Sequence, residues 1–175
     1  MIAKLFITLV RLSPRFQRAM WRWWYQRLAK RATNSGWTFM NYGYSSLNDN
    51  SSIDLKPEDE SNRLFIQLYN YASSQIPIDN KKVLEVGSGR GGGASFVARY
   101  HHPRLMTGLD YSSYAIKLSN KIHGNVSNLN FIKGDAENLP FDDNTFDAVI
   151  NVESSHCYGN MKKFLNEVYR VLKKG

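Results

Sequence analysis

Short apolar runs alternate along most of the chain with segments in which apolar residues recur every three or four positions. Four runs have the length and apolar content of strands buried on both faces of a sheet: 83–86, 105–110, 129–132 and 146–152. Segments with helical spacing follow three of them: 93–98, 115–118 and 161–172. Strands that alternate with helices are typical of a parallel sheet, so we predict an α/β fold with a doubly wound parallel sheet.

One more helix is predicted before the first strand. Pro57 and the acidic residues 58–60 have the features of a helix N-terminus, because proline fits the first turn and acids interact favourably with the helix dipole. The predicted buried face consists of Leu64, Leu68 and Tyr71. Pro77 is expected to end this helix.

The first 31 residues differ from the rest of the chain. Apolar residues and arginines alternate there at near-helical intervals, which predicts one or two amphipathic helices. Tryptophan and arginine on such a helix suit the headgroup layer of a membrane. The same periodicity also fits a lid helix packed on the main domain, and both interpretations stay open. We expect a helical leader over 1–48, a polar linker over 49–56 and the main domain over 57–175.

The net charge of +8 is concentrated in that leader. Eight of the 23 basic residues lie within 1–31, where no acidic residue occurs, and the other 15 match the 15 acidic residues. The main domain is therefore formally neutral, and no basic–aromatic motif of a known RNA-binding module occurs, so we expect no nucleic-acid partner. The basic leader is instead a candidate contact with an anionic membrane surface.

The expected location is the cytoplasm, with a peripheral contact at the inner membrane surface. A single cysteine, Cys157, excludes an internal disulfide framework and fits a reducing compartment. No apolar run is long enough to span a bilayer. The run 5–10 is short, meets Arg11 and precedes no small-residue cleavage site, so we predict no cleaved signal peptide.

A glycine-rich segment follows the first predicted strand. Gly87, Gly89 and Gly92 have the G-x-G-x-x-G spacing of a nucleotide-binding strand–turn–helix unit, although glycine turns also simply join strands to helices. Asp110 ends the second predicted strand, 21 residues after Gly89. A carboxylate there can accept hydrogen bonds from ribose hydroxyls. The alternative role is a helix N-cap, for which Ser112 is also available.

Three blocks of the chain together resemble the class I S-adenosylmethionine-dependent methyltransferases in order and spacing: 83–89 (VLEVGSG), 108–110 (GLD) and 134–141 (GDAENLPF). A fourth block, 151–158 (NVESSHCY), is similar to one branch of that family. The branch is that of the phthiotriolone and phenolphthiotriolone dimycocerosate O-methyltransferases, with related polyketide, sugar and sterol enzymes. The leader and the segment 41–44 (NYGY) resemble the same branch. The resemblance implies a Rossmann-like sheet in the order 3-2-1-4.

The resemblance also implies S-adenosyl-L-methionine as cofactor and a role for each matching residue. Glu85, Gly87, Ser88, Gly89 and Asn151 would hold its methionine end, Asp110 and Tyr111 the ribose, Asp135 and Ala136 the adenine, and Tyr42 and Tyr44 would close over it. Aromatic rings attract a sulfonium cation, which makes the two tyrosines chemically reasonable.

His156 is the candidate general base. Transfer of a methyl group to a hydroxyl benefits from removal of the proton, and histidine titrates near neutral pH. The alternative is a loop histidine that caps the last helix. The chain has no His/Cys spacing typical of a zinc site, so we predict no metal.

The expected reaction is O-methylation of a lipid or polyketide-like small molecule. In the family, the stretch at 171–175 leads into a fifth strand, so we expect this chain to be a fragment whose strand 146–152 forms an exposed edge prone to self-association. One alternative is a cofactor-binding but inactive remnant that associates with a partner through this edge. Another is a nicotinamide dehydrogenase, against which the block at Asp135 and Ala136 argues.

Overall fold

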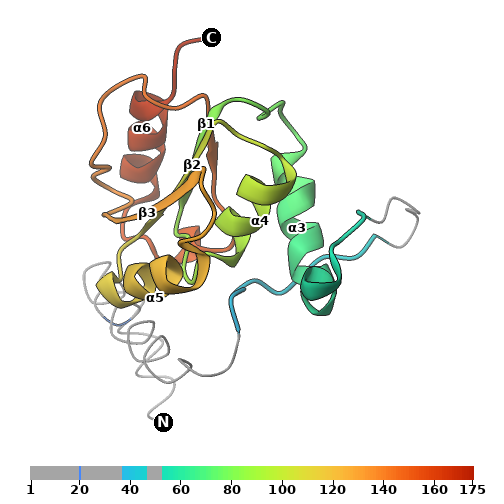
Figure 1. Ribbon diagram of the computed structural model, residues 1–175. Helices are drawn as coiled ribbons and strands as arrows, with labels where there is room; N and C mark the ends of the chain where they lie inside the picture. The colour runs from blue at the N-terminus through green and yellow to red at the C-terminus, as the bar shows by residue number, and fades with distance from the viewer. Residues whose placement is uncertain (1–19, 21–36, 47–52) are drawn as a thin grey trace.

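The computed structural model describes residue 20 and the ranges 37–46 and 53–175. It contains a four-stranded sheet made of β1 (Lys82–Val86), β2 (Leu105–Asp110), β3 (Leu129–Lys133) and β4 (Ala148–Ile150) (Figure 1). The helices are α3 (Arg63–Ser73), α4 (Gly92–Tyr100), α5 (Ser113–His123) and α6 (Met161–Val171), with 3₁₀ turns η1 (Pro57–Asn62) and η2 (Ser155–Cys157). The helices predicted within 1–31 and half of the predicted linker, residues 49–52, lie outside the described residues.

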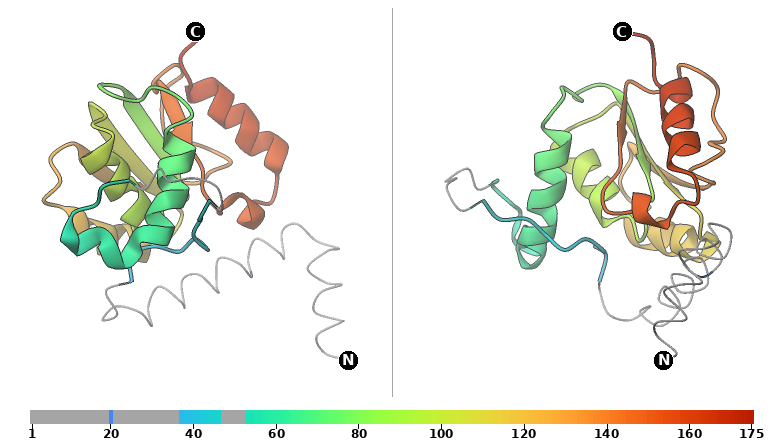
Figure 2. Two further views of the ribbon diagram at one scale, coloured as in Figure 1. Left: turned by 90° about the vertical axis from the view of Figure 1, so that its right-hand side faces the viewer. Right: turned by 180° about the vertical axis from the view of Figure 1, so that it is seen from behind.

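All strands are parallel and follow the order β3-β2-β1-β4, which confirms the predicted sheet. Val83 of β1 pairs with Met106 on one side and Ala148 on the other. Successive side chains of a strand point to opposite faces of the sheet. Val83 accordingly packs into the core beneath α3 and α4, and Leu84 into the core beneath α6. Figures 1 and 2 show these helices on opposite sides of the sheet.

The buried face of α3 differs from the prediction. The helix buries Ile66, Tyr69 and Ser73, whereas Leu64 and Tyr71 are each 55% exposed. The sequence pattern failed because two of the buried positions are polar and find partners elsewhere in the chain: the Tyr69 hydroxyl donates to Glu85, and the Ser73 hydroxyl lies 3.0 Å from a nitrogen of His101. The helix also ends at Ser73, before Pro77, and Pro57 begins a 3₁₀ turn instead of an α-helix.

The last helix likewise buries fewer of its apolar residues than expected. Phe164 and Val171 of α6 are buried, but Met161 and Leu165 are 44% and 55% exposed.

Within the described ranges, no helix has both the length and the apolar character needed to cross a membrane.

The edge of the sheet at β4 is shorter and better paired than predicted. Regular pairing covers 148–150 instead of 146–152. Next to it, Phe146 and Leu172 form an isolated parallel bridge, in which Phe146 N–H donates to Val171 O and Lys173 N–H donates to Phe146 O, each at 2.9 Å. The outer backbone row is therefore occupied at Phe146, which corrects the expectation of a fully unpaired edge. Self-association through the rest of the β4 edge stays a prediction.

Candidate functional site

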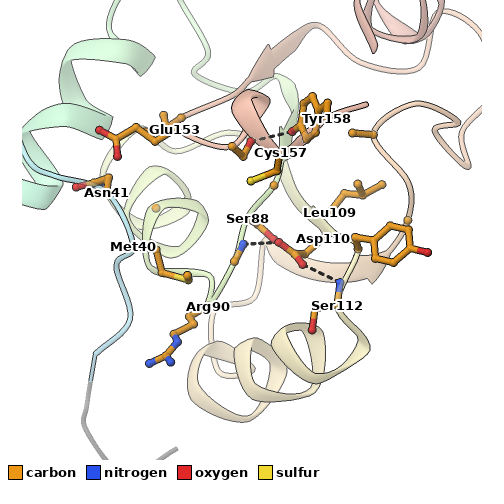
Figure 3. A pocket seen from close by; sticks show the side chains of 18 of the residues that line it. Met40, Asn41, Ser88, Arg90, Leu109, Asp110, Ser112, Glu153, Cys157 and Tyr158 are labelled. Carbon is orange, nitrogen blue, oxygen red and sulfur yellow. Dashed lines mark hydrogen bonds between the residues drawn. The ribbon is translucent and has the colours of Figure 1, made fainter. Parts of the chain in front are cut away.

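A cavity opens at the carboxyl ends of the parallel strands (Figure 3). Open α/β sheets bind ligands at this edge, where neighbouring crossovers leave in opposite directions. The lining comes from 38–41, 87–90, 109–112, 134–137, 152–154 and 157–158, with Tyr69 and Gly93. The site thus combines the turn after β1, the ends of β2 and β3, the loop after β4 and a segment that precedes the sheet in sequence.

The turn after β1 and the start of α4 each depend on a glycine. Gly87 has a φ of +82°, and a Cβ built on it would lie 2.2 Å from Ser154 Oγ. A Cβ on Gly93 would lie 1.9 Å from the ring of Tyr69. Any side chain at either position would therefore collide with another part of the cavity wall, and at Gly87 it would also adopt a strained backbone conformation.

The Asp110 carboxylate joins this turn to the end of β2. Its Oδ2 accepts the N–H of Gly89 at 2.9 Å and its Oδ1 accepts the N–H of Ser112 at 2.8 Å, as the dashed lines in Figure 3 show. Burial raises the pKa of Asp110, and these two N–H groups oppose the rise. The N-cap of α5 is Ser112, whose Oγ accepts from Ala115 N–H at 3.3 Å. Asp110 is thus left to face the cavity, and each oxygen keeps a further lone pair for a hydroxyl donor.

Glu85 lies behind the cavity wall in the middle of the sheet. It is fully buried, its Oε1 accepts the Tyr69 hydroxyl at 2.6 Å, and its Oε2 has no hydrogen-bond partner. Burial raises the pKa of Glu85 to about 7, while the hydrogen bond from Tyr69 opposes this rise. A buried carboxylate oxygen without a donor is costly, so this atom indicates a position where a ligand donor would be stabilising.

The loop after β4 is held together by side chains. Asn151 Nδ2 lies 2.9 Å from Val86 O and 2.8 Å from both Ser154 Oγ and the Tyr158 hydroxyl. Ser154 Oγ also reaches Val86 O at 3.1 Å. Burial raises the pKa of Tyr158 to about 12. Asn151 itself does not line the cavity; it fastens the loop to β1 so that Ser154 and Tyr158 do.

The charged side chains that line the cavity are mostly acidic. In the described part of the chain they are Asp110, Asp135, Glu137, Glu153 and one base, Arg90. Glu137 is 5% exposed, and its Oε1 accepts the N–H of Gly159 at 2.8 Å. Arg90 points its guanidinium away from these acids, over the ring of Trp37 at 4.7 Å. Such a distribution of charge favours a cationic ligand. Among the described residues, no group of His, Cys, Asp and Glu could hold a metal ion.

Residues 84–175 match a family model described as a methyltransferase domain. This chain belongs to that family. The methyltransferase is 45% identical over 156 residues to the phthiotriol/phenolphthiotriol dimycocerosates methyltransferase of Mycobacterium tuberculosis, covering 89% of this chain and 57% of that protein. It is 46% identical over 151 residues to the fatty-acid O-methyltransferase of Mycolicibacterium smegmatis, covering 86% and 54%. The chain spans a little over half the length of these curated relatives.

Among solved structures, the methyltransferase is similar to the [4+2]-cyclase SpnF, with a TM-score of 0.68 and 23% identity, covering 86% of this chain and 54% of that one. That likeness supports the fold alone. The predicted membership of the class I methyltransferases is confirmed by the family match and the curated relatives.

Most cofactor-binding residues predicted for the methyltransferase meet at the cavity: Gly87, Ser88, Gly89, Asp110, Tyr111, Asp135 and Ala136 all line it. Glu85 and Asn151 lie one layer behind. What each of them does toward a cofactor stays a prediction, since the structure shows where they are and not what they bind.

Tyr42 and Tyr44 do not lie over the cavity. Tyr42 is 95% exposed and Tyr44 stacks on Tyr71 at 5.2 Å. Tyr44 N–H donates to the carbonyl of Leu64 in α3 at 2.9 Å. The side chain of the neighbouring Asn41 is also bonded to α3, because its Nδ2 donates to Phe65 O at 3.1 Å. Tyr42 N–H instead donates to Oε2 of Glu153 at 3.1 Å. The neighbouring residues 38–41 line the cavity in their place.

His156 is exposed in η2 and does not line the cavity, whereas the two residues after it do. The helix-capping alternative for His156 is wrong, because Asn160 caps α6 by accepting the N–H of Lys163 at 3.0 Å. Its role as a general base stays a prediction. Cys157 is half-buried and lines the cavity. Because η2 has only three residues, the sequence shows no periodicity from which the inward orientation of Cys157 could be inferred.

Proposed function

We propose that this domain binds S-adenosyl-L-methionine and serves O-methylation of a lipid-like small molecule. The observation that carries the proposal is the Asp110 carboxylate, held by the N–H groups of Gly89 and Ser112 beside the glycine turn. A carboxylate fixed at the end of β2 suits the two hydroxyls of a ribose. The lipid-like acceptor is proposed from the relatives, whose names specify dimycocerosates and a fatty acid.

The residues present fit this cofactor in charge as well. Its methionine end carries an ammonium group, for which Glu85 Oε2 is a buried acceptor without a donor. Its sulfonium is a cation, and the described residues that line the cavity include four acids and one base. Asp135 and Ala136, which follow β3 and line the cavity, would contact the adenine by resemblance. Each part of the ligand thus has a chemically matched part of the wall.

When bound, the cofactor supplies an electrophilic methyl group. The chain's own contribution is positioning: the turn 87–89 and Asp110 fix one end of the ligand, and the loop 151–158 forms the opposite side of the cavity. Holding two reactants in line lowers the entropic part of the barrier. We retain His156 as the proposed acceptor of the hydroxyl proton, by resemblance.

Calorimetry with S-adenosylhomocysteine and, separately, NAD tests the proposal. We expect the first to bind and the second not. Transfer of a labelled methyl group to long-chain fatty acids or diols, followed by mass spectrometry, then tests the reaction. Binding without transfer would support the alternative of a cofactor-binding protein that acts through a partner. A folded chain that binds only NAD, or neither compound, would contradict the proposed function.

We also propose that residues 1–31, which lie outside the described residues, contact an anionic membrane surface. Co-sedimentation of the full chain and of a variant lacking 1–31 with anionic vesicles, at low and high salt, tests this contact, because salt screens attraction by basic residues. Vesicle binding that survives the deletion would place the contact in the main domain.

A further inference from the structure

One side chain of α3 reaches into the middle of the sheet. Tyr69 is 6% exposed, and its hydroxyl donates to Oε1 of the fully buried Glu85 at 2.6 Å. The ring is held by contacts on two sides. It packs against Gly93 at the start of α4, where any side chain would collide with it, and it contacts the ring of Phe39 edge-on at a centroid distance of 6.1 Å. Tyr69 precedes the glycine motif and belongs to none of the sequence blocks that indicate a methyltransferase.

Among the described residues, the groups that act on Glu85 include no positive charge. Three elements present these groups: α3 contributes the Tyr69 hydroxyl, β2 contributes the acidic Asp110, and α4 contributes the backbone N–H of Ala94. Glu153, after β4, adds a further negative charge that acts on Tyr69. Glu85 Oε2 has no hydrogen-bond donor. A cationic donor from a ligand would supply both a hydrogen bond to this atom and a positive charge that these groups do not provide.

Residues that line the cavity lie between it and Glu85. Tyr69, Gly87 and Gly93 line the cavity, whereas Glu85 does not. The two glycines add no side chain to this part of the wall. Tyr69 links the cavity to the carboxylate, because its hydroxyl lies 2.6 Å from Glu85 Oε1.

We infer that Tyr69 is a positioning residue for cofactor binding: its hydroxyl holds Glu85 so that Oε2 accepts the ammonium group of the cofactor's methionine end, and binding thereby releases a proton near neutral pH. This inference rests on the proposed function. The proton balance is simple. A protonated Glu85 loses its proton to solvent, and the resulting carboxylate accepts a hydrogen bond from the ammonium, which stays protonated.

The direction of the pH dependence follows from the two states of Glu85. Its pKa is about 7 in the free protein, and a bound cation lowers it. Binding near pH 6 should therefore release close to one proton, and binding at pH 8.5 almost none. The Tyr69 hydroxyl stabilises the ionised form, so Tyr69→Phe raises the pKa of Glu85 further. For a rise of one pKa unit, binding weakens about tenfold at pH 6 and hardly changes well above both pKa values.

The experiment is calorimetric titration of the full chain with S-adenosylhomocysteine between pH 6 and 8.5. Each pH is measured in two buffers of different ionisation enthalpy, which gives the number of protons released. The variants are Tyr69→Phe, Glu85→Gln and the control Tyr71→Phe, which changes an exposed tyrosine on the same helix. We expect Tyr69→Phe to weaken binding at pH 6 far more than at pH 8.5, Glu85→Gln to abolish proton release, and Tyr71→Phe to match the wild type.

Two results would overturn the inference while leaving the proposed function intact: wild-type binding without proton release, or a loss in Tyr69→Phe that is equal at every pH. Failure of the wild type to bind would instead contradict the proposed function. If Tyr69→Phe binds too weakly to titrate, carbon NMR of labelled glutamate in the free protein decides. The Glu85 signal, assigned as the one absent from Glu85→Gln, should titrate at higher pH in Tyr69→Phe, and an unchanged midpoint would refute the role of Tyr69.

Discussion

Two walls of the cavity are held together by different kinds of interaction. The turn wall, residues 87–90 with 109–112, uses backbone: N–H groups bonded to Asp110 and glycines that leave room. The loop wall, residues 151–158, uses side chains bonded to one another and to Val86 O, across 65 to 68 positions of sequence. The turn wall follows the spacing of the glycine motif, whereas the loop wall depends on contacts between distant residues, so its hydrogen bonds could not be inferred from the block 151–158.

The largest effect is expected where the two walls touch. Gly87→Ala places a Cβ within 2.4 Å of the Ser154 side chain, at a φ of +82°. We expect a loss of about 2–4 kcal/mol in the free energy of unfolding, measured in urea, from overpacking and backbone strain. Ser154→Gly removes the closest contacts of that Cβ but also the hydrogen bonds of Ser154 Oγ. The loss caused by Gly87→Ala should therefore be smaller when it is measured in a Ser154→Gly background than in the wild type. An equal loss in both backgrounds would contradict the contact between the walls.

Glu85→Gln should stabilise the free protein at alkaline pH. The pKa of Glu85 is about 7 when folded and near its ordinary value of 4.5 when unfolded. Between these values the folded state binds more protons, so stability falls as pH rises and is level above pH 7. The difference corresponds to about 3 kcal/mol. Thermal or urea unfolding should show Glu85→Gln more stable than wild type at pH 8 and similar at pH 4.5. Equal stability at both would contradict this.

Asp110→Ala removes the carboxylate from the turn wall. We expect S-adenosylhomocysteine to bind about 10- to 100-fold more weakly by calorimetry, because hydrogen bonds to a charged group contribute roughly 1.5–3 kcal/mol. Asp110→Asn should also weaken binding, because its amide NH₂ would replace one of two oxygens that each accept a backbone N–H. An unchanged Kd would remove Asp110 from the binding site.

Tyr158→Phe probes the loop wall in the same way. It removes the hydroxyl that lies 2.8 Å from both Asn151 Nδ2 and Ser154 Oγ. The expected loss in the free energy of unfolding is about 1 kcal/mol, typical of one neutral hydrogen bond. Cofactor affinity should change little. A larger effect on affinity than on stability would mean that the hydroxyl contacts the ligand directly.

The smallest effect on stability is expected at His156, which is exposed. His156→Gln should change the free energy of unfolding by less than about 0.5 kcal/mol. If His156 is the general base, the same variant should lower the rate of methyl transfer about 10²- to 10⁴-fold. A full rate in His156→Gln would exclude that role and leave the residues of the loop wall that do line the cavity as candidates.

The sheet was largely predictable and the placement of several side chains was not. Strand β2 has the predicted bounds, and Ser112 caps α5 as its position allowed. These features depend on the alternation of apolar strands with helices and on residues that are close together in the sequence. The face of α3 could not be inferred, because burial of Tyr69 depends on a carboxylate 16 positions away. The positions of His156 and Cys157 relative to the cavity depend on one short turn.

The pairing of β1 with β4 has a consequence for protein synthesis. Asp147 Oδ2 accepts the N–H of Lys82 at 2.8 Å, although 65 residues separate them. Strands β1, β2 and β3 can pair as they leave the ribosome, but the edge of β1 that faces β4 stays unpaired until Asp147 has been synthesised. At a typical elongation rate this wait lasts roughly 3–13 s. An open apolar strand invites pairing with other chains, so slowed translation of this interval should lower the yield of soluble protein.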